Sequence, residues 1–390
     1  MRYLSVPCLF ALLPFAALAA EPPPHSVPSR AALEAEVARV MEATSAQGLA
    51  IAVIDDGRVV HVSAHGKRNA AGDPLQVDTI MYGASLTKAV FAYTVMQLDE
   101  EGVIDLDRPI GGYFPEPLTD YPVVPGYGPW PDLADDERWK AITARILLTH
   151  SAGFANFAFL EPDGKLRIHF DPGTRYAYSG EGLILLQYVL ERGLGLDLGQ
   201  EMQRRVFDRF GMPRTNMTWR EDFAGNLADG WTVDGQVEPH DARSRVRAAG
   251  SMDTTIADMA NFAAAYINGE GLSAQGAEAL TSAQLAISTA SQFPSLQAEI
   301  PASERRADLA SGLGVVVFDG PQGAGFFKGG HNDSTGNTWV CVKARKRCVV
   351  ILSNDVRAER AFPRLVAFAL GDTGVPWAWE YGQQAFLPRD

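Results

Sequence analysis

The chain has 390 residues, of which 46% are hydrophobic and 21% are charged. This composition supports a large buried core and excludes a disordered, collagen-like or coiled-coil protein. The 34 basic and 47 acidic residues give a formal net charge of -13. A nucleic acid or an anionic membrane is therefore not expected as a partner, because either would require a basic surface. At this length, one large domain and two closely packed lobes are both compatible with the sequence.

The first twenty residues differ from the rest of the chain. They carry one positive charge, at Arg2, followed by an apolar run that two prolines interrupt and by the small residues Ala17-Leu18-Ala19. These features are typical of a secretory signal peptide, whereas a membrane anchor requires about 20 unbroken apolar residues. We therefore expect residues 1–19 to be a cleaved signal peptide, no membrane anchor to remain, and the protein to be periplasmic or secreted.

A linker at residues 20–30 precedes the first predicted elements. Apolar residues at helical spacing predict a helix over 31–46, and residues 49–54 and 59–62 are predicted as strands around a tight turn. An amphipathic helix is predicted from Ser85 to Glu101. Short helical patterns and long loops between about 105 and 300 indicate a helical lobe.

The last part of the chain returns to short β runs. Strands are predicted at 313–318, 325–329, 338–342 and 348–353, and a helix at 358–370. Strands at both chain ends with helices between them predict an α+β fold, in which an antiparallel sheet built from both ends is flanked by helices and carries an inserted helical lobe. The domain is expected to span 31–375. Residues 376–390 are expected to form a C-terminal extension, with Trp377 and Trp379 as packing anchors.

Cysteine usage fits an exported protein. Cys8 would leave with the signal peptide, so Cys341 and Cys348 remain on two adjacent predicted strands. The turn between these strands could place the two sulfurs opposite each other. A disulfide and a pair of buried thiols are both compatible with this pattern.

Ser85 and Lys88 lie in the first turn of the helix predicted from Ser85 to Glu101. A three-residue spacing places both side chains on one helix face, so Lys88 can reach the Ser85 hydroxyl. The helix N-terminus also offers free N–H groups where an oxyanion would form. A lysine can activate a serine only if burial or a neighbouring cation lowers the lysine pKa.

Two further motifs give this pair a context: Tyr176-Ala177-Tyr178-Ser179-Gly180 and Lys328-Gly329-Gly330. With them the sequence resembles the serine β-lactamase and penicillin-recognising family, in the branch of class C β-lactamases, DD-peptidases and β-lactamase-fold esterases. That family carries Ser-x-x-Lys, Tyr-x-Asn and Lys/His-x-Gly in this order. The resemblance covers nearly all of the chain after the signal peptide, with supporting stretches at 147–153, 248–252 and 351–354.

The resemblance implies a role for each matching residue. Ser85 would be the acylated nucleophile, Lys88 and Tyr178 the proton-transfer pair, and Lys328 the cation that lowers the pKa values of that pair. Backbone N–H groups of Ser85 and His331 would form the oxyanion hole. The substrate-binding positions would be Gly180, Gly329 and Gly330.

Two of these positions depart from the family pattern. Gly180 stands where the family usually has the Asn that binds a substrate acylamide, and Gly329 where lactamases and DD-peptidases usually have a hydroxyl that binds the substrate carboxylate. Each lost hydrogen bond is worth about 1–3 kcal/mol, so peptide and lactam recognition is expected to be weak. Gly180→Asn with Gly329→Thr is expected to restore it if the chain accepts the new side chains.

The sequence therefore predicts an exported serine hydrolase that acts through an acyl-enzyme on a small-molecule ester, peptide or lactam, with esters preferred. One alternative is a class C-like β-lactamase or D-alanyl-D-alanine carboxypeptidase. An alternative of another class is a catalytically weak penicillin-recognising module that binds or regulates. A penicillin or fluorophosphonate probe would separate the enzyme from the binding module.

Other polar and aromatic residues are open to more than one interpretation. A metal site built from His61, His65, His240, Asp241, His331 and Asp333 is not favoured, because the spacing of a metallohydrolase is missing; no metal and no cofactor are expected. His150 is expected to be a structural histidine. Aromatic residues of the loop 111–131 could line a substrate cleft or cover the surface: Tyr113, Tyr121, Tyr127 and Trp130.

Overall fold

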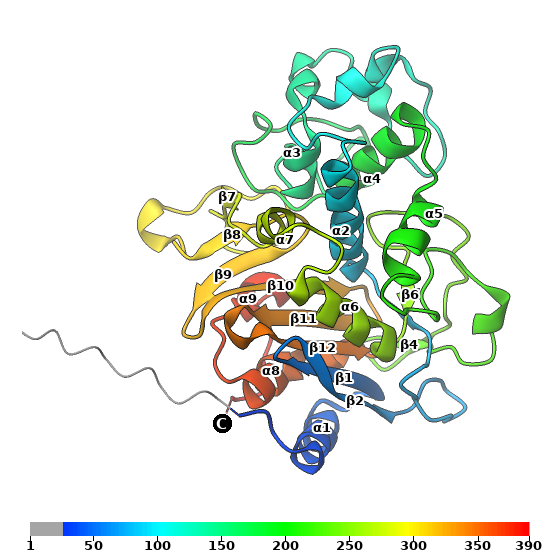
Figure 1. Cartoon of the computed structure of the whole chain (residues 1–390), viewed down its shortest axis with the longest axis vertical. Coiled ribbons are helices and arrows are strands. Elements are labelled where there is room, and N and C mark those ends of the chain that lie inside the picture. The colour runs from blue at the N-terminus through cyan, green and yellow to red at the C-terminus, as the bar shows by residue number, and fades with distance from the viewer. Residues whose placement is uncertain (1–25, 390) are drawn as a thin grey trace, which may run out of the picture.

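The computed structural model describes residues 26–389 (Figure 1). The expected signal peptide at 1–19 lies outside the described residues. Within residues 26–389, none of the helices combines the length and the apolar character that crossing a bilayer requires.

An eight-stranded antiparallel sheet forms the centre of the molecule, with the strand order β2-β1-β12-β11-β10-β9-β8-β7. Because β1 pairs with both β2 and β12, the sheet joins the two ends of the chain, as the adjacent blue and orange strands of Figure 1 show. This confirms the predicted fold class. The strands are β1 (Gly48–Asp55), β2 (Arg58–Gly66), β7 (Leu285–Ala286), β8 (Leu309–Ser311), β9 (Val316–Gly320), β10 (Gly323–His331), β11 (Gly336–Val342) and β12 (Arg347–Ser353).

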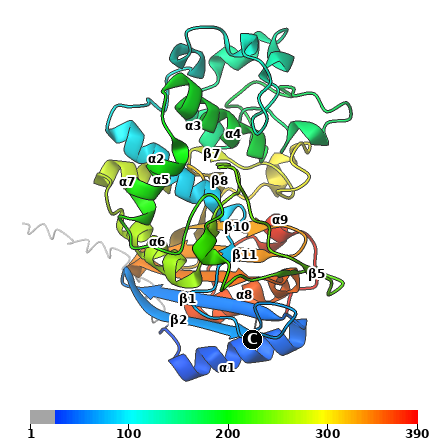
Figure 2. The ribbon, with the colours of Figure 1, turned by 90° about the vertical axis from the view of Figure 1, so that its right-hand side faces the viewer.

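Helices cover both faces of this sheet, so its central strands β1, β11 and β12 are buried on both sides. Leu49, Ile51 and Val53 of β1 pack in one core cluster with residues of α1 (Arg30–Thr44), α8 (Phe362–Leu370) and α9 (Trp377–Tyr381). The alternate β1 residues pack in the other cluster with α2 (Leu86–Glu100) and α6 (Ile256–Asn268). Figures 1 and 2 show α1 below the sheet and α2 above it.

The inserted lobe lies beyond α2 and contains α3 (Ala144–Leu148), α4 (Gly180–Tyr188) and α5 (Leu198–Met202) (Figure 1). Although α6 belongs to the same stretch of sequence, it packs against β1, β2 and β12. The same stretch also contains α7 (Ala274–Leu280) and the two-residue strands β4 (Gly230–Trp231), β5 (Val237–Glu238) and β6 (Asp253–Thr254). The short strand β3 (Met81–Tyr82) precedes α2 and pairs with β6.

Aromatic residues of the loop 111–131 pack inside the lobe. Tyr127 and Trp130 lie 4.9 and 5.8 Å from the Tyr188 ring, centroid to centroid. Tyr121 lies 6.1 Å from the same ring, while Tyr113 stacks under the guanidinium of Arg108. These residues stabilise the lobe and are not among the residues that line the pocket around Ser85.

The predicted strand at 313–318 begins later in the structure, with β9 at Val316. Gly314 interrupts it with a φ of +78°, and a Cβ there would lie 2.4 Å from Ala92 of α2. The chain thus approaches α2 closely at a position that only glycine accommodates.

Candidate active site

Ser85 lies between β3 and α2, where it is the N-cap of the helix. The preceding residue, Ala84, has a φ of +46°, a left-handed conformation that is costly for a residue with a Cβ and is typical of functional sites. Because Leu86, Ala89 and Val90 are fully buried, packing fixes α2 and hence the Ser85 hydroxyl. The N–H groups of Leu86, Thr87 and Lys88 donate to the carbonyls of Gly83, Ala84 and Ser85, so it is the positive end of the helix dipole at Ser85 that can stabilise an oxyanion there.

Lys88 lies one turn along α2 and contacts the serine directly. Its Nζ is 2.9 Å from Ser85 Oγ and donates to the Ala249 carbonyl at 2.5 Å. Its side chain is buried, and this burial, together with the positive charge of Lys328, holds the pKa of Lys88 well below its ordinary value, while Glu380 acts in the opposite direction. Lys88 therefore has the position and the lowered pKa that a neutral general base requires.

Tyr178 approaches Ser85 from the segment that precedes α4. Its hydroxyl donates to Ser85 Oγ at 2.9 Å, and its ring packs 4.5 Å from the ring of His150. The Ser179 N–H donates to His150 Nδ1 at 3.2 Å, so this histidine has a structural role beside Tyr178. Burial raises the pKa of Tyr178, which is the direction opposite to the lowering expected from Lys328, so Tyr178 keeps its proton at neutral pH.

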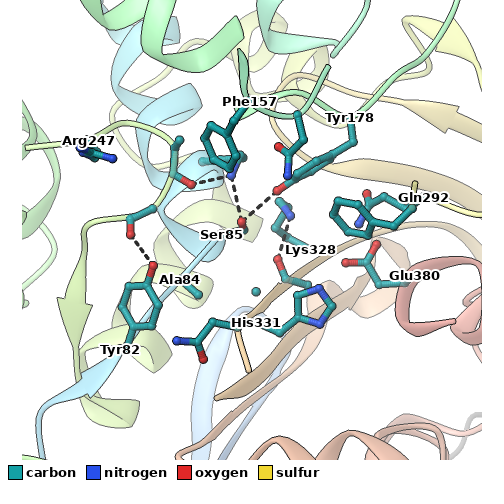
Figure 3. A pocket seen from close by; sticks show the side chains of 18 of the residues that line it. Tyr82, Ala84, Ser85, Phe157, Tyr178, Arg247, Gln292, Lys328, His331 and Glu380 are labelled. Carbon is teal, nitrogen blue, oxygen red and sulfur yellow. Dashed lines mark hydrogen bonds between the residues drawn. The ribbon is translucent and has the colours of Figure 1, made fainter. Parts of the chain in front are cut away.

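Lys328 is brought to the same place by β10. Its Nζ lies 5.1 Å from the centroid of the Tyr178 ring, and Lys88 Nζ lies 5.0 Å from the same centroid. The Lys328 ammonium donates to the Gly329 carbonyl at 2.7 Å, and burial lowers its pKa. Lys328 thus acts on Lys88 through its charge, as the resemblance implies. Figure 3 shows Ser85, Tyr178 and Lys328 converging on one pocket.

The end of β10 passes against the N-terminus of α2. A Cβ on Gly330 would lie 2.9 Å from the Leu86 nitrogen and 3.1 Å from the Ser85 nitrogen, so glycine leaves the space that an oxyanion would occupy. His331 follows at the pocket wall, and its Nδ1 lies 2.9 Å from Glu359 Oε1. Burial opposes protonation of His331, but the hydrogen bond and charge of Glu359 raise its pKa.

The two glycines that depart from the family pattern are covered by other side chains. Gly180 does not line the pocket, because a Cβ there would lie 2.5 Å from the Phe157 ring. A Cβ on Gly329 would lie 2.0 Å from Glu380 Oε1. The expectation that Gly180→Asn with Gly329→Thr restores lactam recognition remains a prediction, and its condition is now specific: Phe157 and Glu380 must move out of the space that the new side chains require.

The pocket has a volume of about 440 Å³ and includes several residues that the sequence pattern did not indicate: Tyr82, Asn156, Phe157, Arg247, Gln292, Phe293 and Glu380. Gln292 is held by the hydroxyl of Tyr176, which donates to its Oε1 at 3.0 Å. Apart from Tyr82, which lies on the two-residue strand β3, these residues come from irregular segments and from α9, where no periodic pattern marks a functional side chain. A carboxyl group next to buried tryptophans was the one available signal for Glu380.

Packing of the last helix places Glu380 at the pocket. Trp377 and Trp379 are buried, and the Trp379 carbonyl accepts a hydrogen bond of 2.8 Å from the Gln292 N–H. The Tyr381 hydroxyl donates to the Asn337 carbonyl at 2.7 Å. The expected extension at 376–390 therefore contributes directly to the pocket wall.

The candidate metal ligands have other partners. His61 and His65 both contact Ser63 Oγ, at 2.8 and 2.9 Å, and His240 lies 3.2 Å from Asp253. Asp241 and Asp333 are exposed. Within residues 26–389, no group of three or more His, Cys, Asp or Glu side chains is arranged to hold a metal ion.

The two cysteines lie directly opposite each other in the β11–β12 register. The sulfurs of Cys341 and Cys348 are 2.00 Å apart and form a disulfide. Of the two alternatives that the sequence left open, the structure has the bridged pair.

Comparisons with known proteins agree with this geometry. The family model described as Beta-lactamase matches residues 33–370. The chain is 31% identical over 200 residues to a lovastatin esterase of Penicillium rubens, covering 44% of this chain and 49% of the esterase. It is 32% identical over 181 residues to a monacolin J acid methylbutanoyltransferase of Aspergillus terreus, covering 40% of this chain and 43% of the transferase. The chain thus spans about half the length of the curated relatives it matches.

Solved structures share the fold at low sequence identity. A D-alanine carboxypeptidase of Burkholderia cenocepacia has a TM-score of 0.67 at 19% identity, covering 87% of this chain and 98% of that structure. An octameric penicillin-binding protein homologue of Pyrococcus abyssi also has a TM-score of 0.67 at 19% identity, covering 88% of this chain and 77% of that structure. The chain belongs to the beta-lactamase family, whose serine hydrolases and acyl transferases act on ester, peptide or lactam substrates.

Proposed function

We propose that this protein is an exported esterase that acts through an acyl-enzyme on Ser85. The observation that carries the proposal is the hydrogen bonding of Ser85 Oγ to both Lys88 Nζ and the Tyr178 hydroxyl, each at 2.9 Å, within an accessible pocket. A serine that was merely structural would not require a buried lysine with a lowered pKa beside it.

The chemistry follows from these positions. Neutral Lys88 accepts the proton of the Ser85 hydroxyl while Oγ attacks the ester carbonyl, and the N–H groups of Ser85 and His331 stabilise the developing negative charge. Tyr178 donates its proton to the departing alkoxide, so that an alcohol leaves, and Lys88 reprotonates Tyr178. Water then attacks the acyl-enzyme with the same groups acting in reverse. This sequence transfers the acyl group to water and restores Ser85.

The pocket walls support an ester rather than a peptide or a lactam as the substrate. Gly180 and Gly329 offer no side-chain donor, and their neighbours Phe157 and Glu380 fill the space where such donors would stand. An activated ester depends less on these contacts because it has a better leaving group. The relatives described as an esterase and an acyltransferase also support ester chemistry.

Export is part of the proposal. The first nineteen residues have the composition of a signal peptide, and the Cys341–Cys348 disulfide is typical of a protein that folds in an oxidising compartment. Fractionation of producing cells, followed by N-terminal sequencing of the mature protein, tests this part. Cleavage near Ala19 is expected, and an intact N-terminus in the cytoplasm would contradict export.

Substrate preference is tested by the ratio of kcat/KM for an aryl acetate to kcat/KM for a chromogenic cephalosporin. We expect the aryl ester to be the better substrate and the cephalosporin to acylate slowly or to turn over poorly. A larger kcat/KM for the cephalosporin would replace the esterase assignment with a class C-like β-lactamase. Absence of turnover and of acylation with both would favour the binding or regulatory module.

A further inference from the structure

Glu380 stands where a substrate carboxylate would have to bind. Its Oε1 lies 2.0 Å from the position of a Cβ on Gly329, the residue where the family usually has the hydroxyl that contacts this carboxylate. Figure 3 shows the Glu380 carboxyl group directed into the pocket beside Lys328 and Gln292. In place of a neutral donor, the pocket therefore presents an acidic acceptor.

Glu380 is 4% exposed, and among residues 26–389 no group donates a hydrogen bond to its carboxyl oxygens. The two oxygens are not among the fully buried polar atoms, so they face the pocket and can accept hydrogen bonds from a ligand that supplies the donor. The buried aromatic residues of α9 hold Glu380 in place, because Trp379 and Tyr381 pack in the core and Tyr381 bonds to β11. Glu380 is thus a fixed feature of the pocket.

Other charged residues in the described part of the chain surround the pocket, but none of them forms an ion pair with Glu380. Lys88 and Lys328 lie inside the pocket, Arg247 and Asp333 lie exposed at its rim, and His331 is paired with Glu359. The charge of Glu380 acts on both lysines, so it weakens the attraction that they would exert on an anion. A carboxylate placed against Gly329 would meet a like charge at contact distance.

We propose that Glu380 is a specificity-determining residue of the pocket. It selects esters whose alcohol part carries a cation or a hydrogen-bond donor, and it rejects esters whose alcohol part carries a carboxylate. The alcohol part is the relevant half because, in a D-alanyl-D-alanine peptide, the terminal carboxylate belongs to the departing amino acid. The proposal rests on the proposed function and names the substrate class of the same site.

The test uses three phenyl acetates with a neutral, a trimethylammonio or a carboxylato substituent in the meta position. Values of kcat/KM are divided by the rate of hydroxide hydrolysis, which removes differences in intrinsic reactivity. We expect the wild-type protein to prefer the cationic over the carboxylated ester by about 30-fold or more, and Glu380→Gln to reduce this preference to about threefold, because one buried charge is removed. Asp333→Asn is the matched control, since it removes the same charge at an exposed position.

Each outcome decides between possibilities. A Glu380→Gln variant that cleaves the neutral ester but keeps the wild-type charge preference overturns the proposal, as does an equal loss of preference in Asp333→Asn. If Glu380→Gln fails to fold, Glu380→Ala provides the same comparison. If the wild type cleaves no ester, the proposed function fails. The charge preference is then measured from the dissociation constants of 3-carboxyphenylboronic and 3-(aminomethyl)phenylboronic acid. Tighter binding of the carboxylated boronate would overturn the proposed role of Glu380.

Discussion

Replacing Lys328 by methionine is expected to shift the acidic limb of the pH–activity profile to higher pH. Lys88 accepts a proton only when it is neutral, so activity is present above the pKa of Lys88 and is lost as the pH falls through it. The positive charge of Lys328 disfavours protonation of Lys88, so removing this charge makes the base easier to protonate. Activity should then be lost at a higher pH in the variant than in the wild type.

The size of the effect follows from the geometry. Lys88 Nζ and Lys328 Nζ lie 5.0 and 5.1 Å from the centroid of the Tyr178 ring. They are therefore at most about 10 Å apart and repel each other by about 1.7 kcal/mol or more at an effective dielectric constant of about 20. Both side chains are buried, so solvent screens this repulsion little. In Lys328→Met, the ratio of neutral to protonated Lys88 at a given acidic pH should fall by a factor of about 15 or more.

The assay is kcat/KM for a neutral aryl acetate between pH 4 and 9, corrected for spontaneous hydrolysis, with far-ultraviolet circular dichroism to establish that each variant is folded. Glu380→Gln provides a control of opposite sign, since the charge of Glu380 raises the pKa of Lys88, and its acidic limb should move to lower pH. Superimposable acidic limbs for the wild type and Lys328→Met would refute the electrostatic role of Lys328. Movement of both variants in the same direction would refute it equally.

Three other predictions concern the base, the disulfide and the pocket wall. Lys88→Arg keeps the positive charge but cannot deprotonate, so kcat/KM should fall by about 10²- to 10⁴-fold; a near-wild-type rate would exclude Lys88 as the base. Cys341→Ala with Cys348→Ala should lower the free energy of unfolding in urea by about 2 kcal/mol, and an unchanged midpoint would show that the bridge adds no stability. Gly329→Thr should lower Tm because its Cβ would lie 2.0 Å from Glu380 Oε1, and adding Glu380→Ala should recover most of the loss. A single Gly329→Thr variant as stable as the wild type would contradict this packing.

The sequence was sufficient to predict the helix that carries Ser85 and the antiparallel sheet except for its short strands β7 and β8. The apolar runs of β1, β11 and β12 reflect local rules that hold in the folded chain, and the order of the motifs located Lys88, Tyr178 and Lys328. The sequence predicted a sheet built from both chain ends but not the register in which β1 pairs with β12, because register depends on contacts between distant segments.

The pocket wall could not be predicted in the same way. Phe157, Phe293 and Glu380 lie on irregular segments or on a short terminal helix. The hydrophobic periodicity of such segments does not tell which way a side chain points. Their importance arises from close approach to Gly180, Tyr178 and Gly329, a property of tertiary packing. The raised pKa of Tyr178 also depends on tertiary packing, because it results mainly from burial of the hydroxyl, which the motif alone does not reveal.

The nucleophilic role of Ser85 is the central claim, and covalent reaction of this serine with a probe measures it directly. The protein is treated with an aryl fluorophosphonate, its intact mass is determined, and the labelled peptide is sequenced by tandem mass spectrometry. We expect one added phosphonyl group on Ser85, with neither labelling nor ester hydrolysis in Ser85→Ala. Labelling of a different residue, or hydrolysis that persists in a folded Ser85→Ala variant, would contradict it.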